Sequence, residues 1–316
     1  MIRSVVVQTP ARLHWGLFRP AGDPGTTVFG GIGLMVSSPG VEIEVTAGPC
    51  ALPLPWPERL IPILSRLRGG RACDSLQIKR VATPPAHAGF GSGTQLALAT
   101  ALAVSKIWGL SEDPDELIRA SGRGLRSGIG CHGFFRGGLL VDAGKNQGES
   151  HVAPLTDRID LPEQLRIVVV LPEEPGQWHG RREVDAFRRL PGCDVLAERL
   201  RHLAATELLP AARSGDLARL GPLVHEFNRL AGEAFAPVQG GVFASPAIAE
   251  AVEFARSNGI DGVGQSSWGP AVFALCEDSR QAEWLAGLYG RFGHYGLWIA
   301  TPSHAGAKVQ VCVEDS

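Results

Sequence analysis

The sequence has few of the features that mark metal-binding, disulfide-bonded or nucleic-acid-binding proteins. Its six cysteines are scattered and include no Cys-x-x-Cys pair, which argues against a zinc ribbon and against a disulfide scaffold. Only two tyrosines occur in 316 residues, so an aromatic platform for stacking bases is not expected. The net charge of −2 gives no electrostatic reason to expect nucleic acid as a partner.

Long apolar runs are also missing. No stretch reaches the roughly 18 residues that a membrane span requires, and the N-terminal stretch lacks the apolar segment and cleavage signature of a secretory signal. We therefore expect a cytoplasmic protein that does not contact a membrane. The hydrophobic share of 44% supports a large core, and 316 residues suit two domains, which we place at 1–163 and 164–316.

What the sequence does contain is a glycine-rich stretch between a predicted strand and a predicted helix. Residues 83–95 read TPPAHAGFGSGTQ; a strand-like segment, 75–82, precedes them, and an Ala- and Leu-rich helix, 95–108, follows. The unpaired N–H groups and the dipole at such a helix start favour a bound phosphate or pyrophosphate. Ser92 and Gln95 also match a capping box, an alternative that needs no ligand.

The remaining pattern predicts a mixture of strands and helices. Strands are expected at 2–8, 12–18, 34–36, 41–46, 139–143, 166–171, 271–276, 294–300 and 308–313, with 34–36 and 41–46 forming a hairpin. Helices are expected at 53–70, 113–120, 183–190, 194–209, 216–234, 245–257 and 281–289. In the second strand, Arg12, His14 and Gly16 share one face, which suggests an anion site at that face.

A second glycine-rich segment, 122–138, carries several cations and reads GRGLRSGIGCHGFFRGG. Because a structural loop rarely needs so many cations beside so many glycines, we interpret the segment as anion-facing, with a plain loop as the alternative. Asp142, after the strand that follows, is expected to be a turn or salt-bridge residue. The polar segment 172–182 is interpreted as a substrate lid, and 262–270, GVGQSSWGP, as another glycine- and serine-rich loop.

Taken together and in this order, the motifs resemble the GHMP kinase superfamily. The similarity rests on TPARLHWGLF, on PAHAGFGSG in the position of the phosphate loop, and on DGVGQSSWGP, and it covers nearly the whole chain. The resemblance implies an α+β fold with an N-terminal domain like domain 2 of ribosomal protein S5 and a C-terminal ferredoxin-like domain.

Two positions depart from the kinases of this superfamily. Many of them have a Ser-Gly-x-Asp motif whose Asp serves as a base, whereas the matching stretch here, 127–130, ends in Gly130. A lysine expected near the N-terminal motif is replaced by Arg12. A kinase with this sequence would need another way to deprotonate its acceptor.

The details are instead similar to a non-kinase branch, the β-ribofuranosylaminobenzene 5′-phosphate synthases of tetrahydromethanopterin biosynthesis. This similarity rests on RLHWGLF, GGIG, HAGFGSGTQLALATA, GRGLRSGIG with RGGLLVDAG, WHGRREVDAF and GVGQSSWGP. It implies a pentosyltransferase that condenses phosphoribosyl pyrophosphate with 4-aminobenzoate or 4-hydroxybenzoate and releases CO2 and pyrophosphate. It also implies Mg²⁺ as a cofactor and a homodimer. The alternatives are an ATP-dependent small-molecule kinase and a non-catalytic sensor of a phosphate ligand.

Under this hypothesis the site residues fall into two groups. The candidates for catalysis are Arg12, His14, Arg126, His132 and His179. The candidates for binding substrate or phosphate are His87, Gly89, Gly91, Ser92, Gly93, Thr94, Gln95, Arg123, Arg136, Gln265, Ser266, Ser267 and Trp268. For any single histidine, a structural hydrogen bond is an equally good interpretation, and Trp268 either flanks an aromatic substrate or belongs to the core.

Overall fold

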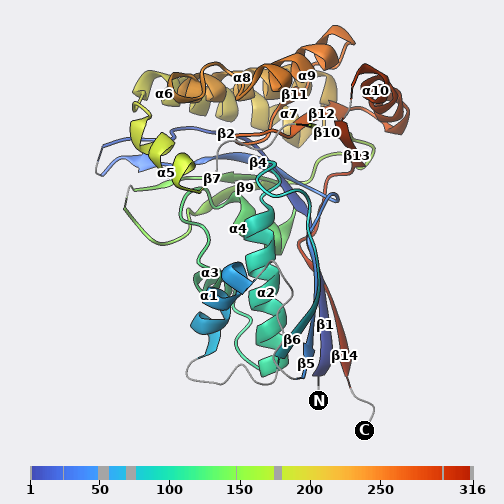
Figure 1. Cartoon of the computed structure of the whole chain (residues 1–316). Helices are drawn as coiled ribbons and strands as arrows, with labels where there is room; N and C mark the ends of the chain where they lie inside the picture. Colours follow the sequence, from blue (N-terminus) through green and yellow to red (C-terminus); the bar gives the residue numbers. More distant parts are fainter. Residues whose placement is uncertain are drawn as a thin grey trace.

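The computed structural model describes residues 2–23, 25–48, 57–68, 76–146, 148–173, 180–293 and 295–313. They form an elongated α+β molecule with antiparallel sheets in both halves (Figure 1). Most of the expected strands and helices are present. The exceptions are described below, and in each of them contacts between distant segments outweigh the preference of the local sequence.

The lower half is a four-stranded sheet in the order β14 (Lys308–Val313), β1 (Ile2–Gln8), β5 (Glu42–Ala47) and β6 (Leu76–Ala82). Helices α1 (Pro57–Arg68), α2 (Ser92–Trp108) and α3 (Pro114–Ser121) cover one face (Figure 1). Helix α2 is rich in Ala and Leu, and it is buried along most of its length against β1 and β5. This packing fixes the direction in which its N-terminus points.

The middle of the molecule is a second sheet, whose strands follow the order β2 (Ala11–Leu17), β4 (Gly31–Val36), β7 (Leu139–Asp142) and β9 (Leu155–Ile159). Helix α4 (Ile129–Arg136) packs on it, and the short strands β3 (Thr27–Val28) and β8 (Lys145–Asn146) pair beside it. Helix α4 lies inside the segment 122–138, for which the sequence predicted no helix. It forms because its apolar residues Ile129, Cys131 and Phe134 are buried despite the surrounding glycines.

The upper half contains the third sheet, in the order β11 (Val263–Gln265), β12 (Val272–Cys276), β10 (Arg166–Pro172) and β13 (Tyr295–Ala300). Above it lie α6 (Asp194–Leu203), the π-helical turn η1 (Ala204–Leu208), α7 (Leu209–Ser214), α8 (Leu217–Gln239), α9 (Pro246–Ser257) and α10 (Ser279–Phe292) (Figure 1). Along β10, Ile167 and Val169 belong to a core with α6–α8 and β2, while Val168 and Val170 face α9 and α10. Burial on both faces explains the continuous apolar run of this strand.

The predicted hairpin of 34–36 with 41–46 is wrong, because β4 and β5 belong to different sheets. Instead, β1 pairs with β5 in the first sheet, and β2 pairs with β4 in the second sheet. The chain passes from the first sheet to the second between β1 and β2, and it returns between β4 and β5. Thr9 joins these two passages: its N–H donates to the Val41 carbonyl at 2.8 Å, and its hydroxyl accepts from the Val41 N–H at 3.1 Å.

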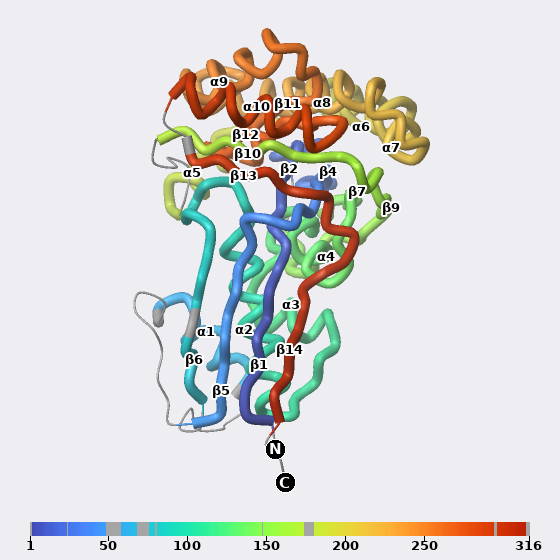
Figure 2. The backbone as a smooth tube through the Cα atoms, turned by 90° about the vertical axis from the view of Figure 1, so that its right-hand side faces the viewer, coloured from blue at the N-terminus to red at the C-terminus, as the bar shows by residue number. Residues whose placement is uncertain are grey.

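The chain also crosses back between the two halves at its end. Strand β14 pairs with β1, so the last strand of the segment 164–316 completes the first sheet beside the N-terminal strand (Figure 2). Among the described residues, no helix is long and apolar enough to cross a membrane.

The close approach of Gly40 to Thr9 can be tested by measuring the stability of Gly40→Ala. A Cβ at Gly40 would lie 2.0 Å from the Thr9 carbonyl oxygen, and backbone on both strands would have to move. We expect the free energy of unfolding to fall by about 1–3 kcal/mol in denaturant titrations, the cost typical of overpacking. As a control, Gly287→Ala on α10 adds a Cβ with no atom within 4 Å and should leave stability unchanged or raise it by about 0.5–1 kcal/mol.

Candidate active site

The N-terminus of α2 is open to a ligand. Gly91 caps the helix with a left-handed backbone (φ 67°), and its carbonyl accepts from the N–H groups of Thr94 and Gln95. No side chain caps this end: Gln95 donates to the Gly130 carbonyl at 2.8 Å instead, so the capping-box alternative is wrong. Among the described residues, the N–H groups of Ser92 and Gly93 make no hydrogen bond, which leaves them available to an anion.

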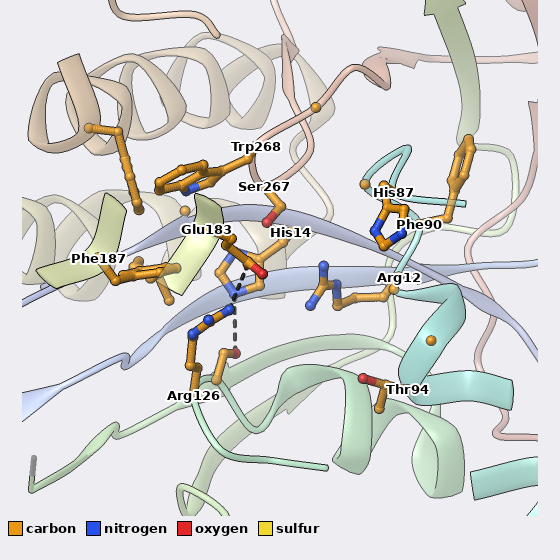
Figure 3. A pocket seen from close by; sticks show the side chains of 18 of the residues that line it. Arg12, His14, His87, Phe90, Thr94, Arg126, Glu183, Phe187, Ser267 and Trp268 are labelled. Carbon is orange, nitrogen blue, oxygen red and sulfur yellow. Dashed lines mark hydrogen bonds and ion pairs between the residues drawn. The ribbon is translucent and has the colours of Figure 1, made fainter. Parts of the chain in front are cut away.

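A cavity of about 920 Å³ opens in front of this helix end. Its walls come from the glycine loop, β2, the loop 122–127, α5 (Gly180–Arg189), α8 and the loop 265–269. The predicted site residues that line it are Arg12, His14, His87, Gly89, Gly91, Ser92, Gly93, Thr94, Arg123, Arg126, Gln265, Ser267 and Trp268. Segments far apart in sequence are thus brought to one cavity (Figure 3).

The other predicted site residues lie elsewhere. Gln95 and Ser266 are buried just behind the cavity wall. His132 and Arg136 lie on α4 and do not line the cavity: His132 contacts the Ala153 carbonyl at 2.7 Å, and Arg136 is exposed. His179 falls outside the described residues.

Two arginines flank the helix end without a carboxylate partner. Arg12 lies against Gly91, and Arg123 lies over Gly93, about 3.7 Å from where a Cβ would stand. Neither forms an ion pair with a described carboxylate, and the Nε atom of Arg12 is buried without a hydrogen bond. Burial lowers the pKa of Arg12 to about 10; burial, and then the neighbouring Arg59 and Arg66, lower that of Arg123. The charge of Glu183, which pairs with Arg126, raises the pKa of Arg12 less than burial lowers it. The excess positive charge at this helix end favours an anionic ligand.

Gly130 stands where many kinases of the superfamily have an aspartate, and it lies beside Arg12. A Cβ there would lie within 3.7 Å of the Thr94 side chain and of Arg12 Cδ. An aspartate at this place would sit beside Arg12 and partly neutralise it, as expected for an ion pair. With glycine, the positive charge of Arg12 is left for a ligand.

His14 belongs to a chain of hydrogen bonds that begins at a buried carboxylate. Its Nε2 atom lies 3.1 Å from Ser127 Oγ, and the Ser127 hydroxyl donates to Asp142 Oδ2 at 2.8 Å. Asp142 also accepts from the N–H groups of Gly128 at 2.8 Å and Gly144 at 3.0 Å. Burial raises the pKa of Asp142 to about 6, although these hydrogen bonds lower it. Burial, and then the charge of Arg12, lower the pKa of His14 well below its ordinary value, so the ring is neutral.

Sequence reasoning missed the role of Asp142. It is fully buried in β7, forms no salt bridge with any residue that the structure describes, and holds the loop that carries Ser127. Lys145 supports the same loop from β8, where its Nζ donates to the Gly124 carbonyl at 2.8 Å. The sequence contains one signal for this role, namely that a charged residue, Asp142, ends an otherwise apolar strand. Asp142 and His14 are far apart in the sequence, so the hydrogen bonds that connect them through Ser127 could not be predicted.

The far end of the cavity is aromatic. The rings of Phe187 on α5 and Trp268 stack with centroids 5.2 Å apart, and Phe235 meets both rings edge-on. Arg126 covers the Phe187 ring at 4.3 Å and pairs with Glu183 at 2.6 Å. Trp268 belongs to a small apolar cluster, as the core interpretation expects, and it also lines the cavity, so its contact with an aromatic substrate stays a prediction.

Buried polar groups hold the walls together. Ser266 Oγ accepts from the His14 N–H at 3.0 Å and donates to the Gly89 carbonyl at 2.8 Å, so it ties β2 to the glycine loop. Asn228 of α8 donates to the carbonyls of Trp15 at 2.6 Å and Gln265 at 2.8 Å. These bonds place Ser266 and Asn228 as supports of the site.

Protein ligands for a metal are not apparent. Among the described residues, no three His, Cys, Asp or Glu side chains form a group that could hold a metal ion. Of the carboxylates in the cavity wall, Glu183 is paired with Arg126 and Asp185 lies 3.4 Å from Arg188. The part of the chain that the structure describes therefore offers no cluster of protein ligands, and an Mg²⁺ ion in this cavity would be held mainly by substrate phosphates and water.

Comparison with known proteins agrees with this geometry. The family models for the N-terminal and C-terminal domains of GHMP kinases match residues 60–136 and 208–286. Two curated relatives are named beta-ribofuranosylphenol 5′-phosphate synthase. The one from Methanothermobacter thermautotrophicus is 32% identical over 88% of this chain and 90% of its own length; the one from Archaeoglobus fulgidus is 30% identical over 86% and 88%. The solved structure of a homoserine kinase from Cytophaga hutchinsonii matches with a TM-score of 0.67 at 16% identity, covering 98% of both chains, and so supports the fold alone.

The buried Asp142 generates a prediction about pH. Folding raises the pKa of Asp142 from 3.8 to about 6, so the folded protein binds its proton more tightly than the unfolded chain does, and the carboxylate form prevails above about pH 6. The stability that this group contributes is therefore complete below pH 3.8 and is lost as the pH rises through about 6. Relative to Asp142→Asn, the unfolding free energy of the wild type should fall by up to about 3 kcal/mol between pH 4 and 7. Chemical denaturation across this range tests it; a difference that does not change with pH contradicts it.

Proposed function

Since this chain belongs to the family of the beta-ribofuranosylphenol 5′-phosphate synthases, within the GHMP kinase superfamily, we propose that it forms a C-riboside from phosphoribosyl pyrophosphate and a para-substituted benzoate. Pyrophosphate and CO2 are the other products. The acceptor is 4-hydroxybenzoate or 4-aminobenzoate, and the product enters tetrahydromethanopterin biosynthesis. The observation that carries the proposal lies at the start of α2, where, within the described ranges, two amides make no hydrogen bond and two flanking arginines form no ion pair.

The chemistry of this reaction needs the kind of site that the cavity provides. When pyrophosphate leaves, the ribose C1′ becomes oxocarbenium-like and negative charge grows on the leaving group. Fixed N–H donors and arginines stabilise that charge without rearranging. In our proposal, the N–H groups of Ser92 and Gly93, together with Arg12 and Arg123, bind the diphosphate.

The aromatic end of the cavity suits the benzoate. Trp268, Phe187 and Phe235 form an aromatic wall against which an arene would pack. Arg126 lies beside this wall in an ion pair with Glu183, and in our proposal it also donates to the carboxylate of the substrate. In the view of Figure 3, His14 lies between this aromatic end and Arg12. The ribose carbon and the ring carbon that attacks it would therefore meet near His14.

We assign Mg²⁺ no cluster of protein ligands, because the described residues contain no group of three His, Cys, Asp or Glu side chains that could hold it. In the proposal the ion enters as the counter-ion of the substrate's diphosphate. The arginines that flank the glycine loop neutralise negative charge independently of it.

An ATP-dependent kinase is the weaker alternative. Gly130 stands beside Thr94 and Arg12, where an aspartate would have been placed to act as a base. The synthase reaction needs no base to remove a proton from the ring carbon that is attacked, because CO2 leaves from that carbon instead.

A direct assay separates these functions. Purified protein is mixed with Mg²⁺, phosphoribosyl pyrophosphate and carboxyl-labelled 4-hydroxybenzoate or 4-aminobenzoate. We expect labelled CO2 and pyrophosphate in equal amounts. Formation of ADP from ATP with an alcohol acceptor, and no release of CO2, would instead support the kinase.

The glycine loop is tested by Gly93→Ala. A Cβ there meets only the Arg123 guanidinium, at ordinary contact distances of 3.7–3.9 Å, so the fold should accept it. It would, however, crowd a diphosphate at the adjacent N–H groups. We expect the Kd for phosphoribosyl pyrophosphate, measured by calorimetry, to rise by about tenfold or more, equivalent to about 1.4 kcal/mol. Thermal stability should not change, and Gly287→Ala should bind as the wild type does. An unaltered Kd in Gly93→Ala would place the diphosphate elsewhere.

A further inference from the structure

We propose that His14 accepts the proton of the acceptor's para-hydroxyl group through Nδ1, and that Ser127 and Asp142 are positioning residues that fix the other ring proton on Nε2. This inference rests on the proposed function and adds to it the group that activates the aromatic ring.

The hydrogen-bond directions follow from the number of protons available. The Ser127 hydroxyl has a single proton, and it donates that proton to Asp142 Oδ2 at 2.8 Å. Toward His14, 3.1 Å away, Ser127 Oγ can therefore only accept, so the proton of this bond belongs to His14 Nε2. The Ile129 N–H also donates to Ser127 Oγ at 3.2 Å, which reinforces the accepting role of the oxygen.

The carboxylate at the end of the chain is firmly placed. Asp142 Oδ2 accepts from Ser127 and from the Gly128 N–H, and Oδ1 accepts from the Gly144 N–H. All three donors require an acceptor at Asp142, so its carboxylate form suits them. Asp142 lies behind the cavity wall and acts on the site only through Ser127.

This arrangement leaves Nδ1 of His14 as the atom with a free lone pair. Among the described residues, no hydrogen bond is made at Nδ1, although the ring is almost fully buried and lines the cavity. A neutral imidazole with its proton held on Nε2 is a base at Nδ1. The carboxylates in the cavity wall, Glu183 and Asp185, lie against Arg126 and Arg188 instead.

The proton transfer balances over the whole reaction. The para O–H bond breaks, its proton moves to His14 Nδ1, and its electron pair enters the ring. The ring carbon that bears the carboxylate then bonds to ribose C1′, while the C1′–O bond breaks and its pair leaves with pyrophosphate. Next the C–CO2 bond breaks, its pair restores the aromatic ring as a phenolate, and His14 returns the proton. During the intermediate stage, Ser127 and Asp142 stabilise the imidazolium through Nε2–H.

The test compares acceptors whose hydroxyl groups differ in acidity. Ser127→Ala removes the link between His14 and Asp142 but keeps the bonds of Asp142 to the main chain. The 3,5-difluoro derivative of 4-hydroxybenzoate has a more acidic phenol, which is already ionised at pH 8 and needs no base. We expect Ser127→Ala to lower kcat with 4-hydroxybenzoate by on the order of 100-fold, the scale of general-base catalysis. With the difluoro acceptor, kcat should stay within about threefold of the wild type on the same acceptor.

Two further variants complete the design. His14→Gln should show the same dependence on the acceptor, with an equal or larger loss on 4-hydroxybenzoate. Ser105→Ala removes a buried hydroxyl on α2 that has no hydrogen-bond partner among the described residues and lies outside the cavity; its kcat should match the wild type.

The outcomes separate this inference from the function on which it rests. An equal loss on both acceptors in Ser127→Ala and His14→Gln would mean a purely structural role and would overturn the inference. A wild type active only with 4-aminobenzoate would also overturn it, since there would be no hydroxyl proton to accept. A wild type that releases no CO2 from any benzoate would instead refute the proposed function.

Discussion

The site depends on positive charge that the protein itself does not neutralise. Arg12 and Arg123 stand at the N-terminus of α2 with no carboxylate partner among the described residues, and the first amides of the helix add their own partial charge. Burying such charge is costly unless something compensates it. The fold maintains it by packing α2 along the first sheet, so that the helix end cannot turn away. The uncompensated charge is the reason to expect a diphosphate in the cavity.

Connections between distant segments give the cavity its shape. Ser266 joins β2 to the glycine loop, Asn228 joins α8 to β2 and β11, and Asp142 fixes the loop that carries Ser127. Each connection is a buried polar group with its partners satisfied, which specifies one geometry more strictly than apolar packing does. The result is a cavity with an anion-binding end and an aromatic end, and His14 lies between them (Figure 3).

Sequence reasoning captured the features that are local in the chain. The glycine loop, the helix behind it and the arginines of 122–126 carry their signals within a few residues, and the family resemblance was confirmed. Features made by distant pairing were missed. The hairpin prediction failed because β4 and β5 pair with strands of two different sheets. The connection of Asp142 to His14 spans 15 positions from Asp142 to Ser127 and 113 from Ser127 to His14. The cluster of Phe187, Phe235 and Trp268 also joins residues far apart in the chain, and no local period records such contacts.

The most direct test of the account is a crystal structure with an unreactive analogue of phosphoribosyl pyrophosphate. The account predicts the diphosphate within hydrogen-bonding distance of the Ser92 and Gly93 N–H groups, with the Arg12 and Arg123 guanidinium groups on either side. The ribose C1′ should point toward His14. An analogue bound elsewhere, with the start of α2 left empty or covered by the protein's own side chains, would contradict the central claim.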